Sequence, residues 1–128
     1  MSDRKLVLHR AVGTELPFSD AVLAGDTLYI SGNIGFDPAT GKPGATPELE
    51  ARLVMDGLQR TLEAAGMAMD DLVQVQVFCS DLSCFAAFNE VYRGYFRHGY
   101  PARAFLGSGP LLFGARFEVM GIAVRRTS

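Results

Sequence analysis

Hydrophobic residues between positions 47 and 65 recur at helical spacing. They follow one another at intervals of three and four residues, which places them along one face of a helix. The Thr46–Pro47 pair suits the start of such a helix, and Gly66 suits its end. We therefore predict a helix between these positions. Its apolar face is formed by Ala51, Val54, Met55, Leu58, Leu62 and Ala65.

Alternation of apolar and polar residues predicts strands on both sides of this helix. Residues 71–80 alternate most regularly, and Val73, Val75 and Val77 are expected on one face of that strand with glutamines on the other. The other expected strands are residues 5–12, 21–25, 27–34, 101–109 and 115–126. The turn pair Gly25–Asp26 predicts that two of them form a hairpin.

A second helix is predicted between positions 83 and 99, where aromatic residues follow helical spacing. Ser83 suits its N-cap and Gly99 its end. The stripe consists of Phe85, Phe88, Val91, Tyr92, Tyr95 and Phe96, and a stripe at this spacing is typical of a core-facing surface. The predicted order is therefore β-β-β-α-β-α-β-β. This order describes an α/β sandwich in which two helices cover one face of a six-stranded sheet, within a single domain spanning residues 1–128.

The other face of that sheet also requires burial. Residues 27–34 and 117–124 carry apolar side chains on both faces of their strands, whereas two helices can cover only one face. We expect copies of the chain to pack sheet against sheet, which makes a homo-oligomer.

Composition narrows the possible partners. The chain has 128 residues, of which 48% are hydrophobic and 20% charged, and its formal net charge is −2, which fits one globular domain and not a nucleic-acid-binding surface. No apolar run is long enough to span a membrane or to act as a signal peptide, so we expect a cytoplasmic protein. Cys79 and Cys84 have no Cys or His cluster nearby and match no zinc pattern.

The segment GYPARAFLGSG, residues 99–109, places Arg103 near the start of a strand that is otherwise apolar. A buried guanidinium without a partner costs several kcal/mol, so Arg103 requires a compensating group. Its planar fork suits the carboxylate of a ligand, which it can bind through two parallel hydrogen bonds. The alternatives are an internal Asp or Glu partner, or a side chain that reaches the surface from the strand end.

Two further polar residues are candidates for chemistry. Glu118 shares a strand face with otherwise apolar residues, and a desolvated carboxylate can exchange protons with water or an enamine near neutral pH. The alternative is a salt bridge from Glu118 to Arg116. Asn89, in the second predicted helix, either orients a ligand or hydrogen-bonds a loop backbone.

The elements and four motifs together resemble the reactive intermediate/imine deaminase A family, also called YjgF-like or UK114-like, from about residue 17 to residue 126. The motifs are PFSDAV (17–22), GDTLYISGNIGFDPATG (25–41), FAAFNEVYRGYF (85–96) and YPARAF (100–105) with EVMGIAV (118–124). The resemblance implies a chorismate-mutase-like fold and a homotrimer with ligand clefts between subunits. It also implies hydrolysis of 2-enamino and 2-imino acids to 2-keto acids and ammonia without a cofactor.

The resemblance assigns roles to individual residues. Arg103 matches the arginine that binds the substrate carboxylate, and Glu118 matches the glutamate that positions or activates water. Asn89 matches a pocket asparagine, and Ser31–Gly32 match a strand-end pair whose backbone lines the cleft.

The chain also departs from the archetype of this family. Phe18 stands where a tyrosine is common, and Phe105 stands where the archetypal deaminases have a cysteine. Both changes are expected to make a substrate-binding pocket more apolar and to favour larger side chains on the imino acid. A non-catalytic trimer that binds small carboxylates is the alternative function. The ribonuclease activity with which the family is often labelled is disfavoured by the acidic net charge.

Overall fold

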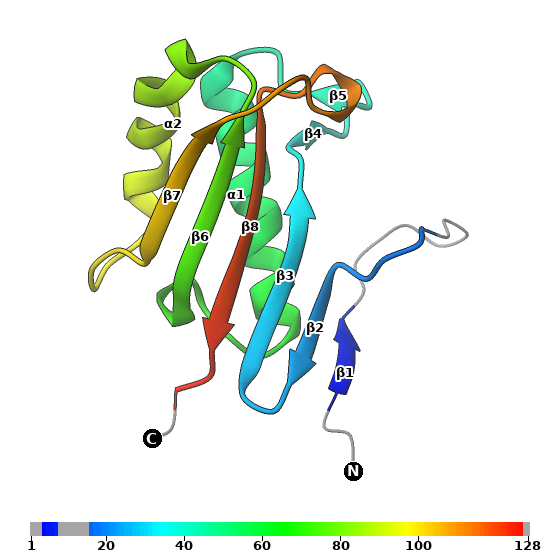
Figure 1. Ribbon diagram of the computed structural model, residues 1–128, viewed down its shortest axis with the longest axis vertical. Helices are drawn as coiled ribbons and strands as arrows, with labels where there is room; N and C mark the ends of the chain where they lie inside the picture. The colour runs from blue at the N-terminus through cyan, green and yellow to red at the C-terminus, as the bar shows by residue number, and fades with distance from the viewer. Residues whose placement is uncertain (1–3, 8–15, 127–128) are drawn as a thin grey trace.

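The computed structural model describes residues 4–7 and 16–126, in which two helices back one face of a mixed sheet (Figure 1). The strands of the sheet are β1 (Arg4–Val7), β2 (Ala21–Ala24), β3 (Thr27–Asn33), β6 (Leu72–Cys79), β7 (Ala102–Gly107) and β8 (Phe117–Val124). They lie in the order β1-β2-β3-β8-β6-β7, and β6 and β7 pair in parallel. The helices are α1 (Pro47–Ala64) and α2 (Phe85–Tyr92). The predicted α/β order and the six-stranded sheet are confirmed.

Two short strands were not predicted. Strands β4 (Phe36–Asp37) and β5 (Lys42–Pro43) form a separate hairpin between β3 and α1. The strand expected over residues 5–12 begins as β1, and its remaining residues lie outside the described part of the chain. Within residues 4–7 and 16–126, neither helix is both long and apolar enough to cross a membrane.

Helix α1 forms as its sequence predicts. The Thr46 side chain accepts a hydrogen bond from the backbone N–H of Leu49 at 3.1 Å, and Pro47 occupies the first turn. Beyond the helix, Gly66 has a φ of +75°, a left-handed conformation that a residue without Cβ adopts most readily. The predicted apolar face is buried against the sheet except for Ala65, which is partly buried just after the helix, and this packing fixes the position of α1 across β3 and β8.

Helix α2 is shorter than predicted. It ends at Tyr92, and the chain continues as one 3₁₀ turn over Arg93–Tyr95 before Phe96 becomes extended. Gly94 weakens the helix at this point because glycine has low helix propensity. The predicted cap is also wrong, since Asp81 accepts hydrogen bonds from both the N–H and the hydroxyl of Ser83 at 3.0 and 2.7 Å.

Strand β6 departs from strict alternation at its start. The register against β8 shifts between Leu72 and Gln74, so the strand contains an irregularity there. Val75 and Val77 are fully buried, but Val73 is 47% exposed. The expectation that all three valines share one face of the strand is therefore wrong for Val73.

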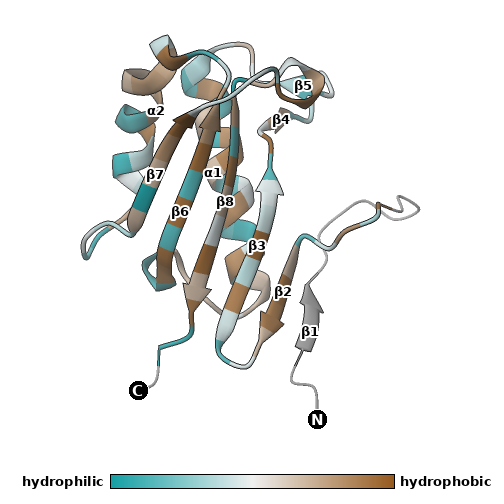
Figure 2. Cartoon of the chain, in the orientation of Figure 1, coloured by the Kyte–Doolittle hydropathy of each residue, from teal (hydrophilic) through white to brown (hydrophobic). Residues whose placement is uncertain are grey.

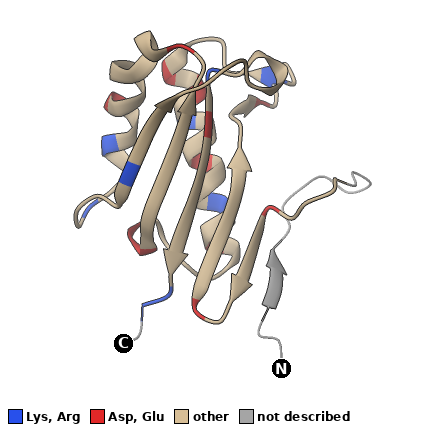
Figure 3. Cartoon of the chain, viewed as in Figure 1, with Lys and Arg blue, Asp and Glu red and all other residues tan. Residues whose placement is uncertain are grey.

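The face of the sheet opposite the helices is open and largely apolar. No described helix covers this open face, and the strands carry brown segments along much of their length (Figure 2). Charged residues lie mainly on the helices and loops, whereas the strands carry very few (Figure 3). Partly or largely exposed apolar side chains on the open face include Tyr29, Phe78, Leu106, Met120, Ile122 and Val124. This matches the prediction that both faces of the sheet carry apolar residues.

A buried ion pair fixes the start of β8 against α1. The Glu50 side chain is fully buried and accepts hydrogen bonds from the backbone N–H groups of Arg116 and Phe117 at 2.8 and 3.1 Å. Nη1 of Arg116 donates to Glu50 at 2.8 Å and also to the carbonyl of Gly44. The predicted alternative of a salt bridge between Arg116 and Glu118 is therefore wrong.

We expect Glu50→Ala to lower the free energy of unfolding by about 3 kcal/mol, near the lower end of the range for breaking a buried pair. Two effects act in opposite directions. Arg116 is partly exposed, so water can solvate its charge in the variant, which reduces the loss. The substitution also leaves two backbone N–H groups without their acceptor, which increases the loss. Urea unfolding measures the change. Glu48→Ala is the matched control, since it removes an exposed carboxylate from the same helical turn. Equal losses in the two variants would contradict this account.

Candidate functional site

Arg103 lies on edge strand β7, on the face of the sheet that the helices cover. It pairs in register with Val75 of β6, which is fully buried beneath the helices. The Arg103 guanidinium carbon lies 4.7 Å from the centre of the Tyr92 ring and 5.2 Å from that of Phe105. A third ring, Phe85, lies at 6.0 Å. Three aromatic rings thus lie around the half-buried guanidinium, at distances that allow cation–π attraction.

Within the described chain, no Asp or Glu pairs with Arg103. The alternative of an internal acidic partner is therefore wrong for these residues. The Arg103 side chain also donates no hydrogen bond to another described residue, so its N–H groups are not used within the described chain. The arrangement therefore leaves Arg103 able to donate two parallel hydrogen bonds to a carboxylate.

Arg103 opens onto a pocket between α2 and β7. The pocket has a volume of about 240 Å³ and is lined by Asn89, Tyr92, Arg93, Tyr100, Pro101 and Arg103. The half-buried Asn89 amide makes no side-chain hydrogen bond to the described residues, so the alternative that it holds a loop backbone is not observed there. Asn89 and Arg103, which both belong to the predicted site, are thus brought together in what we call the Arg103 pocket.

Tyr92 is a member of this pocket that the sequence pattern assigned to the core. The residue is only 4% exposed, and its hydroxyl has no hydrogen-bond partner among the described residues. Burial raises the pKa of Tyr92 to about 12, although the positive charge of Arg103 acts in the opposite direction. The phenol therefore stays protonated at neutral pH and can donate a hydrogen bond.

Tyr92→Phe is expected to leave the unfolding free energy unchanged at neutral pH, or to raise it by up to about 1 kcal/mol, because the hydroxyl it removes is unpaired. Above pH 10 the unfolded phenol ionises first, and the folded phenol follows near pH 12. Wild-type stability should fall over this window, since the unfolded state binds fewer protons there. Urea unfolding at several pH values should show a shallower fall in Tyr92→Phe. A parallel fall in both proteins would contradict the role given to Tyr92.

Phe105 supports the guanidinium but does not line the Arg103 pocket. Its ring packs edge to face against Phe85 and Phe88, with centroids 4.8 and 5.5 Å apart. Phe105 therefore affects which size of ligand fits the pocket less directly than the resemblance to the family suggests. Phe18 is exposed just before β2 and does not line the pocket either.

Glu118 lies on the open face of the sheet, away from Arg103. Its neighbours in β8, Phe117 and Val119, are buried beneath the helices, whereas Glu118 pairs in register with the open-face residue Phe78. The Glu118 carboxylate lies over Gly32, where any larger side chain would overlap it. Arg103 and Glu118 therefore point to opposite faces of the sheet within one chain.

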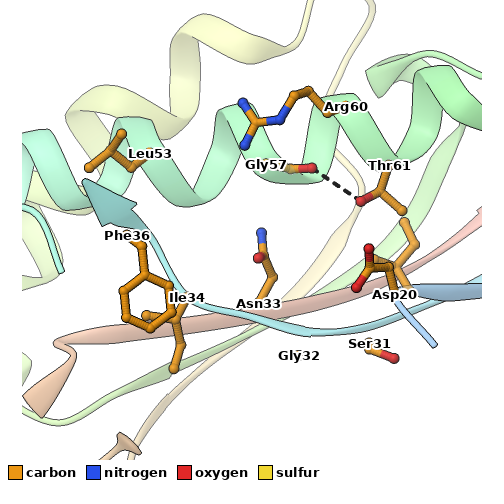
Figure 4. A pocket seen from close by; sticks show the side chains of 11 residues that line it. Asp20, Ser31, Gly32, Asn33, Ile34, Phe36, Leu53, Gly57, Arg60 and Thr61 are labelled. Carbon is orange, nitrogen blue, oxygen red and sulfur yellow. Dashed lines mark hydrogen bonds between the residues drawn. The ribbon is translucent and has the colours of Figure 1, made fainter. Parts of the chain in front are cut away.

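Ser31 and Gly32 line a second pocket, of about 330 Å³, between β3 and α1 (Figure 4). Several of its polar groups are already bonded to backbone carbonyls. The Ser31 hydroxyl donates to Ser19 at 2.6 Å, the Asn33 amide to Val54 at 3.1 Å and the Thr61 hydroxyl to Gly57 at 3.2 Å. None of the residues lining this β3–α1 pocket also lines the Arg103 pocket.

The sequence interpretation missed the roles of Tyr92, Arg93 and Tyr100 in the Arg103 pocket. Helical spacing could have predicted two of them. Tyr92 and Arg93 follow Asn89 by three and four residues and so lie on the same helix face. Tyr100 follows an irregular segment whose path the sequence pattern does not predict. In residues 16–126, no group of three or more His, Cys, Asp or Glu side chains is placed to hold a metal ion.

Comparison with known proteins gives consistent matches over most of the chain. The family profile described as Endoribonuclease L-PSP matches residues 8–125. A goat (Capra hircus) protein named 2-iminobutanoate/2-iminopropanoate deaminase is 40% identical over 111 residues, covering 85% of this chain and 80% of the relative.

Two solved structures extend the comparison to the fold. RidA from the Antarctic bacterium Psychrobacter superimposes with a TM-score of 0.81 at 36% identity, covering 92% of this chain and 94% of that chain. TdcF from E. coli, solved with bound serine, superimposes with a TM-score of 0.87 at 32% identity, covering 95% and 99%.

Proposed function

Since the chain belongs to the Endoribonuclease L-PSP family, which includes the RidA and YjgF proteins, we propose that it hydrolyses 2-imino and 2-enamino acids to 2-keto acids and ammonia. The observation that carries this proposal is the Arg103 pocket, where a half-buried guanidinium has no acidic partner among the described residues. The deaminase name of the goat relative and the serine bound to TdcF support a small carboxylate ligand.

Arg103 acts first, by binding the substrate carboxylate through its N–H groups. A 2-imino acid carries that carboxylate on the carbon next to its C=N bond, so binding at Arg103 also fixes the position of the reacting carbon. Asn89 lies in the same pocket and offers both a donor and an acceptor to the imine nitrogen. These two residues orient the substrate so that water approaches one defined carbon.

The reaction needs only water. Water adds its oxygen to the C=N carbon while a base accepts one proton, and the nitrogen becomes protonated. The hydroxyl group of the resulting tetrahedral carbon then gives up its proton, the nitrogen takes up a further proton, and a C=O bond forms as the C–N bond breaks and ammonia leaves. No electrons are gained or lost overall, so the proposed chemistry requires neither an oxidant nor a reductant. We assign the proton transfers to the Glu118 carboxylate.

Glu118 must come from a second copy of the chain if it serves the same ligand. Within one chain, Glu118 and Arg103 lie on opposite faces of the sheet. The apolar open face favours assembly of copies, and the family resemblance implies a homotrimer with clefts between subunits. Light scattering should therefore give a mass three times the 13.8 kDa of one chain. A monomer under assay conditions would contradict a shared site.

The activity test measures keto acid and ammonia released from 2-iminobutanoate that an amino acid oxidase generates in the assay. The proposal predicts a rate above that in solvent, in proportion to the amount of protein added. If several 2-imino acids hydrolyse at the solvent rate, the protein is not a deaminase. Binding of 2-ketobutanoate without any acceleration would instead favour the non-catalytic carboxylate-binding trimer.

A further inference from the structure

We propose that Arg93 provides a second anion-binding group in the Arg103 pocket, so that the preferred substrates are 2-imino dicarboxylic acids. This inference rests on the proposed function and specifies its substrate class. The observation that carries it is that the guanidinium-bearing residues Arg93 and Arg103 line the same cavity of about 240 Å³. A monocarboxylic imino acid would use only one of these positive charges.

Arg93 is available to a ligand. Its one ion pair within the described residues is with Glu90 at 3.7 Å, three residues earlier on the chain. The Arg93 and Glu90 side chains are 62% and 82% exposed, and exposed pairs of this kind contribute little stability. A ligand carboxylate that enters the pocket can therefore displace Glu90 at small cost.

Two positive charges beside one cavity favour a dianion. Each guanidinium raises the positive potential felt by the other, and a ligand with two carboxylates relieves that repulsion while making two sets of charge-assisted hydrogen bonds. The carboxylate next to the imine carbon binds Arg103, which leaves the distal carboxylate for Arg93. Specificity arises because a monoanionic ligand contacts Arg103 alone and leaves Arg93 in its exposed pair with Glu90.

Two tyrosines and an asparagine are part of the pocket lining beside the two arginines. Tyr92 and Tyr100 stack with centroids 6.3 Å apart and an interplanar angle of 19°, and both belong to the lining together with Asn89. Phe105, which the family resemblance suggested as a substrate-binding residue, does not line the pocket. The expected preference for a large apolar side chain is thereby replaced by a preference for a second carboxylate.

The kinetic test compares 2-iminoglutarate with 2-iminobutanoate, both generated by amino acid oxidases. We expect wild-type protein to have the higher kcat/KM for 2-iminoglutarate. Arg93→Ala should lower the ratio of the two kcat/KM values about tenfold, chiefly through KM, as for loss of one hydrogen-bonded charge contact. Arg93→Lys should restore part of the ratio. Arg97→Ala removes an exposed arginine outside the pocket lining and should leave the ratio unchanged.

A binding measurement separates failure of this inference from failure of the proposed function. Calorimetry should show that Arg93→Ala weakens binding of 2-oxoglutarate about tenfold more than binding of 2-ketobutanoate, whether or not the protein catalyses deamination. Equal effects of Arg93→Ala on the two keto acids would overturn the second anion site. Failure of the proposed function would appear differently, as 2-oxoglutarate binding that depends on Arg93 without acceleration of either imine.

Discussion

Arg103→Ala is expected to lower kcat/KM for hydrolysis of 2-iminobutanoate by about 1,000-fold, within the range observed when one partner of a hydrogen-bonded charge pair is removed. The substitution removes a guanidinium that lies near three aromatic rings, and with it both hydrogen bonds that we propose to bind the carboxylate. Because the carboxylate also fixes the reacting carbon, we expect both binding and orientation to suffer. Steady-state ammonia release measures the loss.

Two further variants test the geometry of this contact. Arg103→Lys keeps the positive charge but loses the planar fork, so it should recover only part of the lost activity. Arg52→Ala removes an exposed arginine from α1, which does not line the Arg103 pocket, and should leave kcat/KM close to wild type. Full activity in Arg103→Ala would contradict the proposed carboxylate site. Circular dichroism of the variants checks that the sheet and helices remain folded.

Glu118→Gln is expected to lower kcat by roughly 10² to 10⁴, the usual contribution of a general acid or base. Glutamine nearly preserves size but cannot accept a proton from water, so binding of 2-ketobutanoate should persist in this variant. The contrast separates an enzyme from a binding protein, because only an enzyme loses turnover while retaining affinity. Glu63→Gln, an exposed change on α1, is the control. An unchanged kcat in Glu118→Gln would remove Glu118 from the mechanism.

Mixing the Arg103→Ala and Glu118→Gln variants tests whether copies share a site. In oligomers assembled from Arg103→Ala and Glu118→Gln chains together, some sites would receive the intact Arg103 from one chain and the intact Glu118 from another. Activity should therefore return after the chains are unfolded and refolded as a mixture. Each variant refolded alone should keep its low activity. No recovery in oligomers shown to be mixed would contradict the assignment of the two residues to neighbouring copies.

Local patterns allowed most of the fold to be predicted. Apolar spacing is a property of adjacent residues, so the helix after Thr46 and the strand around Val75 could be read directly from the sequence. The sequence also allowed Arg103 to be proposed as a site residue, because an arginine in an apolar strand requires a partner. Its surroundings agree with this reasoning, since rings and no described acid contact it.

Features that depend on long-range register could not be predicted. Arg116 pairs with Glu50, which lies 66 positions earlier, and not with Glu118 two positions later. The separation of Arg103 and Glu118 onto opposite faces follows from strand order and register, which the sequence of one chain does not specify. Tyr92 fitted the pattern of a core residue because it is both buried and part of the pocket lining.

The central claim is that Arg103 binds the carboxylate of the substrate, and a crystal structure with 2-ketobutanoate tests it most directly. The crystal structure can distinguish two possible binding sites, since Arg103 lines one pocket and Arg60 lines the other. We predict that the ligand carboxylate accepts two hydrogen bonds from the Arg103 guanidinium, with Asn89 beside the keto group. A carboxylate bound at Arg60 in the β3–α1 pocket, with the Arg103 pocket empty, would contradict the account.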